Sequence, residues 1–347
     1  APMSKYRANL PQLGGQAFLS DSGLETTLIF LEGIDLPFFA AFPLLETPEG
    51  QEALGRYVER HLGIALRDGR GFILDTPTWR SNTDWGAKMG YTPDDLDRIT
   101  RKAVAAALAV RSRAETAATP IVINGVFGPR GDGYRPESLM TAEEACAYHL
   151  PQMTSFAEAG ADMASALTMT HVGEAAGIAR AGQIAGLPVV VSFTVETDGR
   201  LPTGQTLGEA ILETDAATGA APVYYMVNCA HPDHFRGGLD SGAGWMSRVR
   251  GIRANASRQS HAELDVATEL DAGDPVELGA DYLRLLAQHP QINLELGVLL
   301  LERRSPQQAI PYLSKAVAAL PAACPVCRMA LHWHLFHSAQ RSGQRCH

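Results

Sequence analysis

The chain has 347 residues, of which 46% are hydrophobic and 19% are charged, and its formal net charge is −9. This acidic balance, without a run of Lys and Arg, argues against a surface that binds a nucleic-acid backbone. The longest apolar stretches, such as residues 187–193, are far shorter than the roughly 20 residues of a membrane helix, and no signal pattern opens the sequence. We therefore expect a cytoplasmic protein without nucleic-acid or membrane partners, whose five cysteines are reduced thiols.

Short runs rich in β-branched residues alternate with alanine-rich or amphipathic stretches along most of the chain. The predicted strands are Ala17–Ser20, Gly71–Leu74, Pro120–Asn124, Asp162–Leu167, Pro188–Thr194, Val223–Asn228, Val249–Arg253 and Gln291–Leu294. Helices are predicted between them, for example over Pro93–Thr116 and Thr141–Ala159. Eight strands with intervening helices predict an α/β fold of the (β/α)8 barrel (TIM barrel) type.

The residues that follow these strands are polar, and in such a barrel the chemistry collects at the ends of the strands. Asp21-Ser22-Gly23 follows the first predicted strand, Trp79 lies in the loop after the second, and Asn228 ends the sixth. We predict that these five residues line a substrate-binding mouth.

At these positions the sequence resembles the homocysteine S-methyltransferase family. The resemblance runs from about residue 15 to residue 294, through Asp21–Thr26, Ser192–Thr194, Asp198–Leu201 and Val227–Cys229. It implies a zinc ion held by three cysteine thiolates, of which Cys229 is one, at the mouth of the barrel. It also implies methyl transfer to the thiolate of homocysteine from a sulfonium such as S-methylmethionine or S-adenosylmethionine. A free thiol with a pKa of about 8.5 is mostly protonated at neutral pH, and zinc keeps it deprotonated.

Two features depart from the family pattern. The family carries Gly-Gly-Cys-Cys at its eighth strand, whereas Gln291–Leu294 is followed here by Glu295-Leu296-Gly297-Val298, and the chain has no adjacent cysteine pair. Many members also carry a Glu after the fourth strand that receives the ammonium of the substrate, and Leu167 stands at that position. We therefore expect a barrel interrupted at its last strand and leave the acceptor open between homocysteine and a related thiol. The ammonium could instead bind through Asp21 or Glu196.

The last 53 residues differ in composition, with a net charge of +4 against −13 for residues 1–294. We divide the chain into a barrel, 1–294, and a short all-helical tail, 295–347. The tail resembles a tetratricopeptide repeat at positions Leu296, Gly297, Leu300, Ala309, Leu313, Ala316 and Pro321. Such a repeat offers a surface for a protein partner.

Cys324 and Cys327 form a two-ligand clip within this tail. In a helical tail Cys324 and His337 would lie roughly 20 Å apart, too far to share one ion. The two cysteines could complete a zinc site with Cys229 only if the tail folds back over the barrel mouth. His231 and His234, near Cys229, are interpreted as residues of a solvated loop.

The leading hypothesis is a zinc-dependent S-methyltransferase that acts on a small-molecule thiol and a methyl donor. One alternative is a catalytically silent barrel whose tail binds a protein partner. Another is a fused or mis-assembled chain that has lost two zinc ligands.

Overall fold

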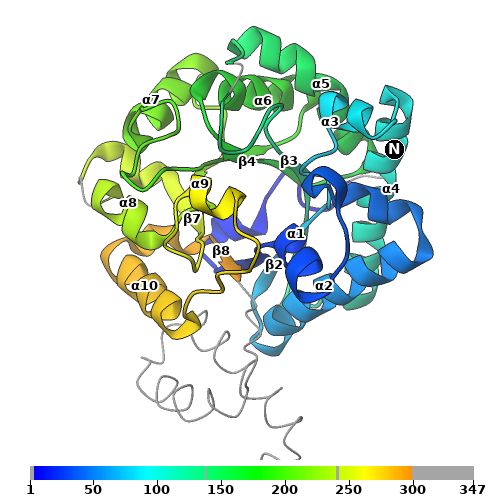
Figure 1. Ribbon diagram of the computed structural model, residues 1–347, viewed down its shortest axis with the longest axis horizontal. Coiled ribbons are helices and arrows are strands. Elements are labelled where there is room, and N and C mark those ends of the chain that lie inside the picture. Colours follow the sequence, from blue (N-terminus) through cyan, green and yellow to red (C-terminus); the bar gives the residue numbers. More distant parts are fainter. Residues whose placement is uncertain (1–3, 137–138, 240–241, 299–347) are drawn as a thin grey trace, which may run out of the picture.

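The computed structural model describes residues 4–136, 139–239 and 242–298. Within these ranges the chain forms a closed barrel of parallel strands, paired in the order β1 to β8 with β8 returning to β1 (Figure 1). The strands are β1 Phe18–Asp21, β2 Gly71–Asp75, β3 Ile121–Phe127, β4 Met163–Met169, β5 Val189–Phe193, β6 Tyr225–Asn228, β7 Val249–Arg253 and β8 Glu295–Val298. The predicted (β/α)8 barrel is confirmed.

The helices surround the barrel (Figure 1). They are α1 Leu24–Thr26, α2 Pro48–Arg67, α3 Thr83–Lys88, α4 Pro93–Ala114, α5 Ala142–Ala159, α6 Val172–Ala185, α7 Leu207–Thr218, α8 Pro232–Leu239, α9 His261–Asp265 and α10 Pro275–Gln288. Short 3-10 or π turns add Pro11–Gly14, Thr27–Leu31, Pro37–Phe39, Phe42–Glu46, Gly244–Arg248 and Pro290–Asn293. Several helices start with a capping box, such as Thr92 with Asp95 and Thr141 with Glu144, which satisfies backbone N–H groups of the first turn.

Side chains alternate between the two faces of each strand, and this alternation divides the core into two layers. In β2, Phe72 and Leu74 pack outward against the helices, while Ile73 packs inside the barrel with Phe18 and Val122. Successive residues of a strand point to opposite faces, so one strand serves both layers. The interior is thus filled at the N-terminal end, which leaves the C-terminal end for polar groups.

The eighth strand was wrongly placed by the sequence pattern. Residues 290–293 form a 3-10 turn, and β8 begins at Glu295, pairing with Phe18 of β1 and Gly251 of β7. A buried glutamate is a costly choice for a strand unless it is paired. Here Arg253 Nη2 lies 2.6 Å from Glu295 Oε1, and the Tyr224 hydroxyl donates to Oε2 at 2.7 Å. The barrel is therefore closed rather than interrupted.

Two positions of the predicted repeat, Leu296 and Gly297, lie in β8 and not in a helix. Residues 295–298 therefore belong to the barrel, although the sequence division placed them in the tail. The rest of that tail, with Cys324 and Cys327, lies outside the described residues. Of the helices described here, none is both long and apolar enough to cross a membrane.

Candidate active site

Closure of the barrel gathers the strand ends at one mouth. Asp21 ends β1 and Asp75 ends β2, and Arg253, at the end of β7, reaches across to Asp75 with Nη1 2.5 Å from Oδ2. Asp21 accepts a hydrogen bond from the Tyr57 hydroxyl at 2.8 Å. Burial raises the pKa of both aspartates, and the charge of Arg253 opposes that rise. The interior beneath the mouth therefore holds more carboxyl groups than cations, with Glu295 as the third.

Cys229 follows β6 in a strained backbone conformation. Its φ is 58°, and Thr168 at the end of β4 has a φ of 61°, both in the left-handed region that residues other than glycine seldom adopt. The two residues are neighbours, with Thr168 Oγ1 3.9 Å from Cys229 Sγ. Asn228 holds the pair together, because its Oδ1 accepts from the Thr168 N–H at 2.9 Å and its Nδ2 donates to Cys229 Sγ at 3.1 Å. Such strain, over-determined by its surroundings, is typical of functional sites.

Two residues from other loops cover Cys229. Tyr134, from the loop between β3 and α5, lies close to the Cys229 sulfur, and its hydroxyl lowers the pKa of that thiol. The Tyr134 ring stacks on His261 with centroids 4.0 Å apart, and His261 Nε2 lies 2.8 Å from the Cys229 carbonyl oxygen. His261 Nδ1 lies 3.1 Å from Glu196. Burial raises the pKa of the Cys229 thiol, although hydrogen bonds from Thr168, Asn228 and Tyr134 lower it.

The remaining predicted residues lie around the same mouth. Gly23 starts α1 with a φ of 80°, a conformation open to glycine, and Ser22 joins β1 to this turn. Trp79, half-buried, packs close to Gly128 and Gly133 of the loop after β3. All five predicted residues therefore lie at the C-terminal ends of the strands or in the segments that follow them, as Cys229 does.

Glu25, in the first turn of α1, adds an unusual acid to this mouth. Its pKa is raised from 4.5 to about 7, mainly by burial and in addition by the carboxyl groups of Asp21 and Asp75, while a backbone hydrogen bond and the charge of Arg80 oppose the rise. The group therefore changes charge close to neutral pH.

The thiolates that a family-type zinc site needs are not all present in the described ranges. Within them the cysteines are Cys146 and Cys229. Cys146 lies on α5, which packs against α6 outside the barrel (Figure 1). A zinc site takes three or four protein ligands, and the partners of the Cys229 sulfur are the uncharged groups of Asn228, Thr168 and Tyr134. The described part of the chain therefore does not fit a three-thiolate zinc site.

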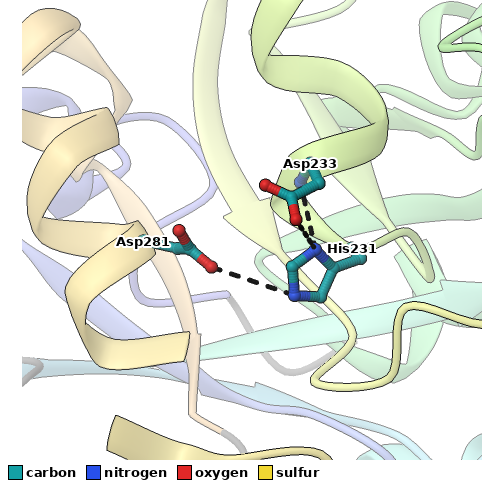
Figure 2. A group of neighbouring side chains, drawn as sticks. All are labelled: His231, Asp233 and Asp281. Atoms are coloured by element: carbon teal, nitrogen blue, oxygen red, sulfur yellow. Dashed lines mark hydrogen bonds and ion pairs between the residues drawn. The ribbon is translucent and has the colours of Figure 1, made fainter. Parts of the chain in front are cut away.

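A second group of potential ligands lies beside the barrel, between α8 and α10 (Figure 2). His231 Nδ1 accepts from the Asp233 N–H at 3.1 Å and lies 3.6 Å from Asp233 Oδ2, whereas Nε2 lies 3.8 Å from Asp281 Oδ2. The two carboxylates thus flank opposite nitrogens of one ring, and an ion binds only one of these. Arg258 pairs with Asp233, and Arg284 contacts Asp281. This geometry is that of a charge-balanced link between helices rather than of a metal centre.

The same cluster corrects the prediction of a solvated loop. His231 is 2% exposed, and His234 lies within α8, where its Nε2 is 3.1 Å from the carbonyl oxygen of Arg258. The Pro-Asp pair after His231 starts a helix, which buries the preceding histidine against α10.

The sequence reading missed four residues of the mouth: Tyr134, Thr168, His261 and Arg80. Tyr134 lies seven residues after the end of β3, and Arg80 follows Trp79 directly. Extending each predicted βα loop by a few residues would have included both. His261 lies eight residues after β7, and only the three-dimensional fold brings it to Cys229.

Comparison with known proteins supports the assignment of the barrel. The family model described as homocysteine S-methyltransferase matches residues 58–282, which is more than half of the chain. The structure is similar to that of the homocysteine methyltransferase MmuM from Escherichia coli in its metallated form, with a TM-score of 0.65 and 18% identity, covering 94% of this chain and 99% of that one. The apo form of the same protein gives a TM-score of 0.56 and 18% identity over 94% and 98% of the two chains. No curated protein sequence matches significantly.

Proposed function

Because the chain belongs to the homocysteine S-methyltransferase family, we propose that this enzyme moves a methyl group from a sulfonium donor to the sulfur of homocysteine or a related thiol. The donor is S-methylmethionine or S-adenosylmethionine. The observation that carries the proposal is the strained Cys229–Thr168 pair at the mouth, held by Asn228 and covered by Tyr134.

In this reaction the protein positions the two substrates and does not need to form a covalent bond with either. A lone pair of the acceptor sulfur forms the new S–CH3 bond, while the bond from the methyl carbon to the sulfonium breaks and its electron pair stays on the donor sulfur. The thiol proton leaves with solvent or a mouth carboxylate. Holding the two sulfurs in line with the methyl carbon supplies much of the rate.

The charges of the mouth suit these substrates. Asp21, Glu25 and Asp75 offer carboxyl groups to a positively charged sulfonium and to the ammonium of an amino-acid substrate. Leu167, 8% exposed, stands where many family members bind that ammonium. We assign its binding to Asp21 or to Glu196, whose side chain is 33% exposed.

A family-type zinc site would need ligands from residues that lie outside the described ranges. A zinc ion at Cys229 requires two further thiolates, and we propose Cys324 and Cys327 for that role. When bound, zinc would keep the acceptor sulfur deprotonated. Cytoplasmic location and a protein partner for the tail stay predictions.

The test uses the full chain with homocysteine and each donor in turn, and measures methionine formation and zinc per chain. We expect methionine from at least one donor, and loss of zinc in the double variant Cys324→Ser/Cys327→Ser. Absence of methionine with both donors would overturn the proposed reaction and favour the silent barrel. Unchanged zinc in the double variant would remove the two tail cysteines from the metal site.

A further inference from the structure

Arg80, in the loop after β2, is a buried cation whose hydrogen-bonding groups are largely unused. It is 7% exposed, and its guanidinium lies between two indole rings, 4.3 Å from the centroid of Trp79 and 4.1 Å from that of Trp85. Nη1 donates to the carbonyl oxygen of Gly131 at 3.1 Å. Nε is buried without a partner, and in the part of the chain that the structure describes nothing accepts from Nη2.

The surroundings of Arg80 are those of the mouth. The charged or polar groups that act on it are Asp132 and Tyr134 from the loop after β3, Glu25 of α1, and Asp265 of α9. Yet among residues 4–136, 139–239 and 242–298 no carboxylate forms a direct ion pair with it. Its charge is therefore buried at the mouth without a close counter-ion.

A buried charge without a partner is costly, and cation–π contacts to two indoles offset only part of that cost. The indoles also fix the plane of the guanidinium, which reduces the entropy lost when a ligand binds. A planar donor fork matches a carboxylate, with two parallel N–H···O bonds. The missing partner is therefore an anion that enters with a ligand.

We propose that Arg80 binds the α-carboxylate of the amino-acid acceptor at the mouth. This inference rests on the proposed function for the identity of the ligand. It assigns opposite ends of a zwitterionic substrate to different groups: the carboxylate to Arg80 and the ammonium to the acidic side of the mouth. Arg80 is thereby a specificity-determining residue, which selects an amino acid over a simple thiol.

The experiment compares the affinities of homocysteine and 3-aminopropane-1-thiol, which is homocysteine without its carboxylate, by calorimetric titration of the full chain. Removing a hydrogen bond to a charged group costs about 1.5–3 kcal/mol, so we expect homocysteine to bind about 10- to 100-fold more tightly. Arg80→Met should bring the ratio of the two affinities close to one by weakening homocysteine alone. Arg80→Lys, which keeps the charge without the planar fork, should retain part of the ratio.

Arg135 provides the matched control. It lies on the same side of the molecule, 3.9 Å from Asp265, with 65% of its side chain exposed. Arg135→Met should leave both affinities unchanged. Because the readout is a ratio of affinities, it does not depend on turnover or on how much of a variant is folded.

The outcomes separate this inference from the proposed reaction. If the wild-type chain binds homocysteine more tightly than 3-aminopropane-1-thiol and Arg80→Met abolishes this difference, the carboxylate site is supported even if no methionine is formed. Equal affinities in the wild-type chain, no binding of either compound, or a ratio unchanged in Arg80→Met would overturn it. If Arg80→Met weakens S-methylmethionine and not homocysteine, the site belongs to the donor and the assignment to the acceptor is wrong.

Discussion

β6 and β8 have different roles in the barrel: the end of β6 carries candidate site residues, whereas β8 closes the sheet. β6 ends in Asn228 and runs into Cys229, whose sulfur contacts Asn228, Thr168 and Tyr134. β8 carries Glu295–Val298, without a cysteine, yet it pairs with both neighbouring strands. Closing a barrel therefore needs correct register and compensated charge, whereas the chemistry needs particular side chains. An eighth strand without a cysteine can therefore still close the barrel.

The strongest way to break the β8 side of this comparison is Arg253→Met. Removing one partner of a buried ion pair leaves Glu295 and Asp75 as uncompensated charges, so we expect the free energy of unfolding to fall by about 3–5 kcal/mol. Urea unfolding followed by circular dichroism measures the change. Arg250→Met is the control, because among the described residues the Arg250 side chain donates only to the Gln291 carbonyl oxygen, at 3.1 Å. Equal losses in the two variants would contradict the role of Arg253 in closure.

Asn228→Ala tests the β6 side. It removes the acceptor of the Thr168 N–H and of the Ser192 hydroxyl, and the donor to Cys229 Sγ. We expect a loss of about 2–3 kcal/mol in the free energy of unfolding, and at least about a tenfold loss of turnover.

Asn255, just beyond the end of β7, offers the control for that variant. Its backbone N–H donates to the Ala230 carbonyl oxygen, and no hydrogen bond of its side chain is present in the described ranges. Asn255→Ala should cost less than about 1 kcal/mol. A similar cost for both variants would show that Asn228 does not hold the strained pair.

Glu25 makes the stability of the mouth depend on pH. Its pKa in the folded chain is about 7 against an ordinary 4.5, so the folded state retains a proton that the unfolded state releases between these values. Stability from this group is therefore highest below pH 4.5 and falls as pH rises to about 7. Between pH 5 and 8, wild-type should lose about 2 kcal/mol relative to Glu25→Gln. Parallel unfolding free energies of the two chains across this range would rule out a raised pKa.

The sequence pattern predicted the fold and the β6 end of the site, but not β8 or the cover of the mouth. Asn228 and Cys229 lie directly at a strand end, so a short local motif identifies them. β8 was misplaced because Glu295 looks unsuitable for a buried strand until Arg253, 42 residues earlier, is known to neutralise it. His261, the first residue of α9, stacks on Tyr134 in the loop after β3, and because the two lie far apart in the sequence no local pattern encodes this contact.

The most direct test of the central claim compares methionine formation by the wild-type chain, Cys229→Ser and Cys146→Ser. Methyl-labelled donor and homocysteine are supplied, and the labelled methionine is measured by mass spectrometry. We expect wild-type and Cys146→Ser to form methionine at similar rates, and Cys229→Ser to be slower by about 100-fold or more, which is about 2.7 kcal/mol in the activation free energy. Unchanged turnover in Cys229→Ser would show that the chemistry does not depend on the β6 end of the mouth.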